Sequence, residues 1–527
     1  MRRHRFLITP VCLVLVSTAL SVCSQESAPS QINNVASDGS ALDAANQLYR
    51  EGKLADAAEA FKAIIKSDDQ SALAYVGLAR VCLALKNPEE AAAAAQTAAK
   101  LAPGLDAVHV ALGEVYFRQG KLTEAENEFT PLVKANSKEA RAYLGLSRIY
   151  HAASYYRTAK LAIDRAHQID PGDPDILRTW IRTLSGPEQL LALQAFLAAH
   201  PGDDPERRDS LLERLNILQN ESSQSFQQCR LVTKVTQAEI KMDRLLYDPI
   251  RVRGFAVNVK LNEASGQLLL DTGASGLVIN RKLAERAGIK PIAEVKVKGV
   301  GDKVAPGAYV GRAGAIRIGN LEFQDCYVRV LDRGSVADGD GLLGADIFSD
   351  FLVDLNLPDG KIRLSELPRR PEDTVGTLSE FKNRYVAPEM KDFTPVFRFG
   401  HMLLVHTRLN DLPGKLFLLD TGAFANTISP VAAREVTKVS ADANTRVKGI
   451  NGSVKDVFRA DELTFQFGHL RQRNRDVVAF DTAGMSNSVG VEVSGTLGFA
   501  MLRLLDIKID YRDGLVDFTY DPNRIIR

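Results

Sequence analysis

The tetrapeptide Asp-Thr-Gly-Ala occurs twice in this chain of 527 residues, at 271–274 and at 420–423. Each copy follows an apolar run that is typical of a buried strand. A carboxylate at the end of a buried strand must be hydrogen-bonded, paired or protonated, because burying it otherwise is costly. Its recurrence in the same setting therefore indicates a functional site rather than a surface turn.

The features that follow each copy keep the same order, which supports a true internal duplication. A helix N-cap comes first, then a β-hairpin with a glycine-rich tip, a Gly-x-Leu-Gly segment that opens a short apolar helix, and an Asp-Gly turn. These features are Asn280, 297–304, 341–344 and 359–360 in the first copy and Ser429, 447–454, 495–498 and 513–514 in the second. We therefore predict two homologous lobes, at 229–366 and 394–521, joined by a linker at 367–393.

This set of features resembles the retropepsin-like aspartic proteases, and the pepsins more distantly. The resemblance implies a double-lobed, all-β fold in which Asp271 and Asp420 are the catalytic pair. The matching positions are Thr272, Gly273, Thr421 and Gly422 in the loops, Gly299, Val300, Gly301, Gly449, Ile450, Asn451 and Gly452 at the flap tips, and Leu342, Leu343, Gly344, Thr496, Leu497 and Gly498 in the supporting segments. Two departures are Phe424, which stands where the first lobe has Ser275, and Thr496, where an apolar residue is usual.

These residue types suit the chemistry that the resemblance implies. Two carboxylates within about 3 Å cannot both ionise, so they share one proton and titrate as a unit. The ionised member can accept a proton from water while the protonated member polarises a carbonyl, without a metal or another cofactor. By resemblance, Thr272 and Thr421 hydrogen-bond across the lobe interface, and the glycine-rich tips close over an extended peptide.

Residues 41–204 show a helical pattern with a period of 34 residues. Small residues recur at Ala57, Ala91, Ala125 and Ala159, and turn positions recur at Gly52, Lys86, Gly120 and Ser154. The period resembles tetratricopeptide repeats, an all-α solenoid, here with four repeats and a degenerate helical pair at about 174–200 as a cap. Such arrays bind peptides or partner proteins, so we expect substrate capture or partner docking in the groove of the array, and a plain spacer is the alternative. A charged helix and a polar linker follow at 205–228.

The N-terminus has the layout of an export signal over residues 1–24: three arginines, an apolar stretch and small residues. The sequence at 20–23 is similar to a bacterial lipoprotein cleavage box, in which Cys23 would be lipid-modified. Ordinary signal cleavage and an uncleaved anchor are the alternatives. We expect an exported protein, periplasmic or tethered to a membrane by its N-terminus, with a flexible linker at 25–40.

The remaining cysteines are Cys82, Cys229 and Cys326, an odd number without metal-ligand spacing. Cys82 lies in an apolar helical pattern, which favours a core position. A bridge between Cys229 and Cys326 is not the arrangement that we expect. His401 and His406 flank a strand of the second lobe and are interpreted as structural or exposed.

The leading hypothesis is an aspartic endopeptidase with both lobes in one chain, monomeric as a catalytic unit, which acts on peptide or protein substrates. The alternative is a non-catalytic scaffold in which the lobes keep the fold and the repeats carry the function. The formal net charge of +1 gives no electrostatic case for a nucleic-acid partner.

Overall fold

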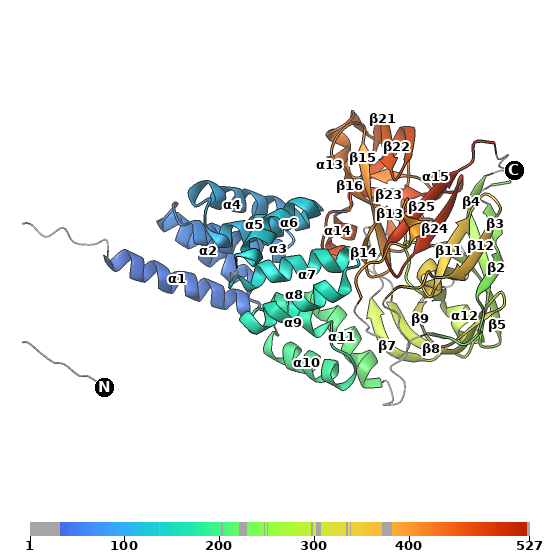
Figure 1. The fold of residues 1–527 in the computed structure, drawn as a ribbon, viewed down its shortest axis with the longest axis horizontal. Helices are drawn as coiled ribbons and strands as arrows, with labels where there is room; N and C mark the ends of the chain where they lie inside the picture. The colour runs from blue at the N-terminus through green and yellow to red at the C-terminus, as the bar shows by residue number, and fades with distance from the viewer. Residues whose placement is uncertain are drawn as a thin grey trace, which may run out of the picture.

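The computed structural model describes residues 32–523, with gaps at 136–137, 202–203, 221–228, 247, 250, 297–298, 302–306, 334–335, 338 and 372–381. An array of paired helices forms the N-terminal part, and β-sheets with a few short helices form the rest (Figure 1). The predicted fold class, a helical repeat array followed by an all-β double-lobed region, is confirmed. The predicted export signal, with Cys23, lies outside the described residues. Within them, no helix is both long and apolar enough to cross a membrane.

The helices of the array follow the predicted period. They are α1 (Ile32–Arg50), α2 (Leu54–Ser67), α3 (Ala72–Ala84), α4 (Pro88–Leu101), α5 (Asp106–Arg118), α6 (Leu122–Lys134), α7 (Ala140–Ala152), α8 (Tyr156–Ile169), α9 (Pro174–Ile181) and α10 (Gly186–Ala199). The four predicted turn positions all adopt the left-handed backbone conformation, with φ between 62° and 77°. The repeated alanines are buried where the helices cross, and Cys82 is buried as predicted.

Helix α1 corrects the linker predicted for residues 25–40, because residues 32–40 are helical. The first half of this helix is mainly polar in sequence, so it shows no apolar periodicity. Its buried residues, Ala45 and Tyr49, come from the second half. Packing of the second half of α1 on the array stabilises the helix, although the polar composition of its first half did not predict one.

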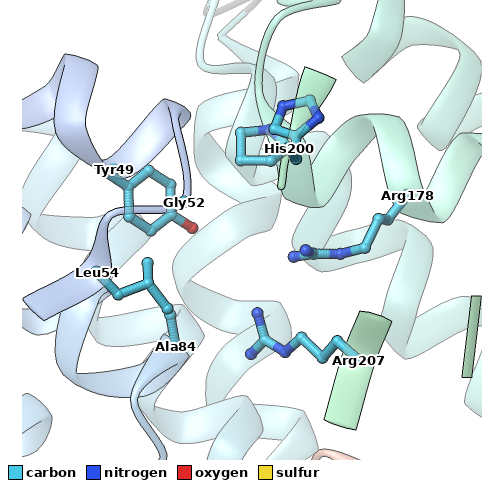
Figure 2. Close-up of a pocket in the computed structure, with 8 residues that line it drawn as sticks. Tyr49, Gly52, Leu54, Ala84, Arg178, His200 and Arg207 are labelled. Carbon is cyan, nitrogen blue, oxygen red and sulfur yellow. The ribbon is translucent and has the colours of Figure 1, made fainter. Parts of the chain in front are cut away.

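The two ends of the array are joined across its concave side. Tyr49 in α1 donates a short hydrogen bond to Asp175 in α9, and Arg50 pairs with Asp170 at 2.6 Å. Between these ends lies a pocket with an empty volume of about 260 Å³ (Figure 2). Its lining includes Tyr49, Leu54, Pro174, Arg178, His200 and Arg207.

Each lobe is built around a sheet that carries one Asp-Thr-Gly loop. The first-lobe elements are β1 (Arg230–Leu231), β2 (Gln237–Lys241), β3 (Asp243–Leu246), β4 (Val252–Leu261), β5 (Ala264–Asp271), β6 (Leu277–Asn280), α12 (Arg281–Arg286), β7 (Pro291–Lys296), β8 (Gly307–Ile318), β9 (Leu321–Leu331), β10 (Gly341–Gly344), η1 (Ala345–Phe348), β11 (Phe351–Asn356) and β12 (Lys361–Glu366). The order of its main sheet is β1-β9-β6-β10-β5-β4-β8-β7, and β3 pairs with β4.

The second lobe repeats this plan. Its elements are η2 (Pro388–Met390), β13 (Thr394–Pro395), β14 (Phe397–Phe399), β15 (Met402–Leu409), β16 (Lys415–Asp420), β17 (Thr427–Ile428), α13 (Pro430–Arg434), β18 (Val439–Ala441), β19 (Lys448–Gly449), β20 (Gly452–Ser453), β21 (Val457–Phe467), β22 (Leu470–Phe480), α14 (Ala483–Val489), β23 (Gly495–Gly498), α15 (Phe499–Leu502), β24 (Leu505–Asp510) and β25 (Leu515–Tyr520). The order of its main sheet is β14-β15-β16-β23-β17-β22-β21-β18. The predicted N-caps, Asn280 and Ser429, each accept a hydrogen bond from a backbone N–H of the helix that follows.

A third sheet joins the lobes in the order β13-β25-β24-β11-β12-β2. Its centre is the antiparallel pair β11–β24, in which Val353 lies opposite Ile509. The predicted Asp-Gly turns close its two hairpins, with Gly360 at φ 65° and Gly514 at φ 64°. One apolar cluster extends through both lobes. The lobes therefore share a core and a sheet, which fixes their relative position.

The array packs directly on the second lobe. The backbone N–H of Glu492 donates to the carbonyl oxygen of Arg118 at 2.8 Å, and the Arg118 guanidinium donates to Asn487 at 2.6 Å. Leu122 shares a buried cluster with Leu404 and Leu416 of the second-lobe sheet. Through these contacts the array packs directly on the β-sheet of the second lobe.

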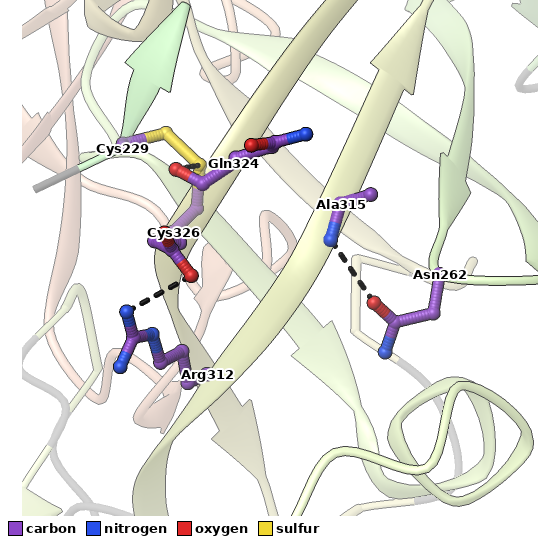
Figure 3. Close-up of a disulfide and its surroundings, with 7 residues drawn as sticks. Cys229, Asn262, Arg312, Ala315, Gln324 and Cys326 are labelled. Atoms are coloured by element: carbon purple, nitrogen blue, oxygen red, sulfur yellow. Dashed lines mark hydrogen bonds and ion pairs between the residues drawn. A yellow bond between two sulfur atoms is a disulfide. The ribbon is translucent and has the colours of Figure 1, made fainter.

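A disulfide between Cys229 and Cys326 corrects the sequence-based prediction (Figure 3). Strand β1 pairs antiparallel with β9, so that Arg230 lies opposite Gln324 and the preceding cysteine reaches Cys326. A strand of two residues has no detectable apolar pattern, which is why the sequence did not indicate this pairing. The bridge fastens the start of the first lobe to its main sheet.

Removal of this disulfide is expected to lower the free energy of unfolding by about 2–5 kcal/mol, because it closes a long loop and restricts the unfolded chain. The two cysteines are 97 residues apart in sequence. Urea unfolding with and without a thiol reductant measures the effect. The reductant should leave the unfolding curve of a Cys229→Ser, Cys326→Ser variant unchanged. A wild-type unfolding curve that is the same with and without the reductant would contradict the prediction.

Candidate active site

Both Asp-Thr-Gly loops lie at the ends of central strands. Strand β5 ends at Asp271 and β16 ends at Asp420, and each pairs in parallel with the strand that carries the supporting glycine. In these pairs Gly344 lies beside Asp271, and Gly498 lies beside Asp420. A Cβ atom on Gly344 would lie 2.6 Å from the Ala274 carbonyl oxygen, closer than real Cβ contacts. Glycine at this position therefore lets the loop pack against its support. The other predicted supporting residues are Leu342, Leu343 and Leu497, and all three are buried.

The carboxyl groups of the two aspartates lie next to each other, because a Cβ atom on Gly273 would lie 3.1 Å from Asp420 Oδ1 and 3.2 Å from Asp271 Oδ1. Burial raises the pKa of both carboxyls, and the charge of Asp420 raises the pKa of Asp271 further. Backbone amides favour the ionised form: Gly273 N–H donates to Asp271 Oδ1 at 2.8 Å, and the N–H groups of Gly422 and Ala423 both donate to Asp420 Oδ1 at 2.9 Å. Burial and the charge of Asp420 raise the pKa of Asp271 more strongly than burial raises that of Asp420, so the pair holds one proton and Asp271 is its better site.

The threonines of the two loops form four hydrogen bonds across the lobe interface. Thr272 N–H donates to Thr421 Oγ1 and Thr421 N–H donates to Thr272 Oγ1, each at 3.0 Å. The hydroxyl of Thr272 donates to the carbonyl oxygen of Leu419 at 2.7 Å, and that of Thr421 donates to Leu270 at 3.0 Å. Both threonines are buried. These reciprocal bonds keep the two loops, and hence the two carboxylates, next to each other.

Gly273 and Gly422 each face the aspartate of the opposite lobe. A Cβ atom on Gly273 would lie 3.0 Å from Asp420 Cγ, and one on Gly422 would overlap the carboxyl group of Asp271. Any side chain here would separate the two carboxylates. Among the described residues, no group of three metal-ligating side chains comes together, here or elsewhere.

The two predicted flap tips contact each other. The backbone N–H of Asn451 donates to the carbonyl oxygen of Val300 at 2.9 Å. Ile450 packs on an apolar group, called here the first-lobe cluster, and so does Ala274 of the catalytic loop. The first-lobe cluster consists of Leu269, Val278, Val295, Ala308, Val310, Leu331, Val336 and Leu342. Gly301, at φ 127°, and Gly452, at φ 92°, adopt backbone conformations that favour glycine. The second-lobe flap tip and the first catalytic loop thus pack on one cluster.

The first loop has two polar supports that sequence analysis did not assign. The Asp346 carboxylate accepts hydrogen bonds from Ser275 Oγ at 3.2 Å and from Gly276 N–H at 2.8 Å. The His401 ring, from the second lobe, places Nε2 3.1 Å from the Gly273 carbonyl oxygen. Burial lowers the pKa of His401, so the neutral ring donates through Nε2 to this oxygen. His401 is therefore structural, and the 128 residues between the partners explain why no local pattern indicated the contact.

The second loop has neutral supports. Gly498 N–H donates to Asn426 Oδ1 at 2.8 Å. Thr496, where the family has an apolar residue, is buried and bonds the Thr427 hydroxyl at 2.9 Å. The side chain of Phe424 is 48% exposed beside the loop. Both departures from the first lobe are therefore accommodated without disturbing the pair of aspartates.

This fold and site define an aspartyl protease-like domain preceded by helical repeats. A family model described as "Aspartyl protease" matches residues 257–347 and 405–500, and two tetratricopeptide repeat models match 42–106 and 86–149. The chain is 25% identical to DnaJ homolog subfamily C member 3 of Rattus norvegicus over 186 residues. This matched segment covers 35% of this chain and 37% of the relative. It is 23% identical to DNA damage-inducible protein 1 of Eremothecium gossypii over 208 residues. This second match covers 36% of this chain and 40% of the relative.

The chain thus combines a retropepsin-like aspartyl protease domain with N-terminal tetratricopeptide repeats. It spans less than half the length of these two relatives.

Replacing Thr272 by valine is expected to lower the free energy of unfolding by about 1–3 kcal/mol, because the buried N–H of Thr421 loses its acceptor. Urea unfolding at a fixed pH measures the loss. Thr272→Ser keeps the hydroxyl and is the matched control, with an expected loss of less than half that value. Equal losses in the two variants would show that the hydroxyl does not stabilise the interface.

Proposed function

We propose that this protein is an aspartic endopeptidase that hydrolyses peptide bonds with a water molecule activated between Asp271 and Asp420. The observation that supports the proposal most directly is the close approach of the two buried carboxyl groups, one from each lobe, at Gly273 and Gly422. The contact between the flap tips, and the packing of Ile450 on the same cluster as Ala274 of the catalytic loop, also support it. Together these features suit a site that closes over a bound peptide.

The proposed reaction uses the two carboxyl groups in different roles. Asp420, whose charge two backbone amides stabilise, accepts a proton as the water oxygen bonds to the scissile carbonyl carbon. Asp271 donates its proton to the carbonyl oxygen, which gives a neutral tetrahedral intermediate. The carbon–nitrogen bond then breaks as the nitrogen takes a proton from Asp420 and one hydroxyl group of the intermediate returns a proton to Asp271. The pair ends with one proton again, so no cofactor is consumed.

We also propose that the protein is exported and that its repeats dock a substrate or partner protein. The disulfide between Cys229 and Cys326 supports export, because such bonds persist in oxidising compartments. The basic and apolar start of the sequence supports it as well, with a membrane tether through the N-terminus or Cys23 as one form of it. Two lobes in one chain support a monomeric catalytic unit.

Asp271→Asn and Asp420→Asn are each expected to lower kcat on the order of 10⁴-fold, because either change removes the shared proton or its acceptor. Cleavage of a peptide library by the purified chain measures this. Asp461→Asn, at an exposed aspartate of the second lobe, is the matched control and should leave cleavage unchanged. If wild type cleaves nothing between about pH 3 and about pH 8, the proposal fails and the non-catalytic scaffold becomes the better account.

The kcat value is expected to fall as the pH rises through the raised pKa of Asp271, because the active pair must carry one proton. Activity should therefore persist above the ordinary aspartate range of about 3.5–4 and be lost at higher pH. A pH profile of kcat measures this. His401→Gln keeps a donor near Gly273 and should retain the same falling limb. A kcat that rises across this range contradicts the assignment.

A further inference from the structure

Helix α11 (Pro205–Asn220) lies between the repeat array and the first lobe, with strand β7 on one side and helix α10 on the other (Figure 1). Asp209, Glu213 and Ile217 recur every four residues, so they share one face of the helix. Asp209 pairs with Lys296 Nζ at 2.6 Å, and Glu213 pairs with Arg329 at 3.5 Å. Ile217 packs on the first-lobe cluster. This face of α11 therefore contacts the protease domain along its length.

Other residues of α11 bind the array. The guanidinium of Arg208 donates to the carbonyl oxygens of Leu197 and His200, each at 3.2 Å. Leu211 and Leu218 are buried in a cluster with Phe196 of α10. Arg207 points toward the central pocket of the array (Figure 2). One helix thus has one face on the repeats and the other on the first lobe.

One of the two ion pairs with the first lobe falls on β7, the strand that leads to a flap tip, and the other falls on Arg329 in β9. Lys296 is the last residue of β7, and Gly299–Gly301 follow shortly after it. Ile217 packs on the same cluster as Ile450, from the other flap tip, and Ala274, from the catalytic loop. Movement of α11 would therefore act on β7 and on the packing between the flaps and the loop.

We propose that α11 is an inhibitory brace: it ties β7 to the repeat array, keeps the flaps together and slows access of substrate until a shift of the array moves the helix. The inhibitory role rests on the proposed protease function. Lys296 and Asp209 are both exposed, and exposed ion pairs are weak, so binding at the array can displace this contact. A ligand in the central pocket would contact Arg207 and thus the same helix.

Hydrogen exchange in the full chain tests the brace without any substrate. The variant Asp209→Asn, Glu213→Gln, Ile217→Ala removes its three contacts, and none of these residues is fully buried. Exchange of the β7 amides at 292–296 should accelerate about fivefold or more, while that of β15 and β16 stays unchanged. Glu263→Gln, which removes an exposed pair with Lys260 in the same lobe, is the matched control. Unchanged exchange in β7 overturns the brace.

Peptide cleavage by the same variants tests the inhibitory role. The triple variant should cleave a short peptide with kcat/KM raised about threefold or more, because the flaps open more often. Asp209→Lys should also accelerate exchange in β7 and raise kcat/KM. Adding Lys296→Asp to this variant should return both quantities to their wild-type values. An unchanged or lower kcat/KM overturns the inhibitory role. If neither wild type nor any variant cleaves the peptide, the proposed function and the inhibitory role fail together. Hydrogen exchange alone then decides whether α11 braces β7.

Discussion

The close approach of the Asp271 and Asp420 carboxyl groups is the constraint on which the rest of the protease domain depends. Two carboxylates repel each other and lose hydration when buried, so they stay together only if a shared proton and the surrounding structure offset this cost. The reciprocal bonds of Thr272 and Thr421 provide part of that structure. The sheet formed by both lobes provides the rest, because its central pair, β11 and β24, fixes each lobe relative to the other.

The repeat array is integrated with this domain rather than tethered to it. Its first and last helices meet through Tyr49 and Asp175, its middle helices pack on the second lobe through Leu122, and α11 contacts the first lobe. An array that is closed on itself and contacts both lobes can transmit a change of shape to them, whereas a flexible spacer cannot. This arrangement supports the proposal that the tetratricopeptide repeats control the site through α11.

Much of this organisation was predictable from the sequence because it depends on short local sequence patterns. The duplicated loops, the Asp-Gly turns and the left-handed turn positions of the repeats each depend on a few neighbouring residues. The disulfide at Cys229 and the contact between His401 and Gly273 depend instead on chain segments that are distant in sequence. Helix α1 was hidden for another reason, since packing of its second half stabilises a first half whose composition resembles a linker. The role of α11 was equally hidden, because its two faces bind different domains.

The most direct test of the shared proton is carbon-13 NMR of the aspartate carboxyl groups across a pH titration, in wild type and in Asp420→Asn. The account predicts that the substitution lowers the pKa of Asp271, because the charge of its partner is removed. That pKa should still lie above the ordinary value, since burial is the larger cause of the shift. An Asp271 pKa that is the same in both proteins would contradict the claim that the two lobes form one site.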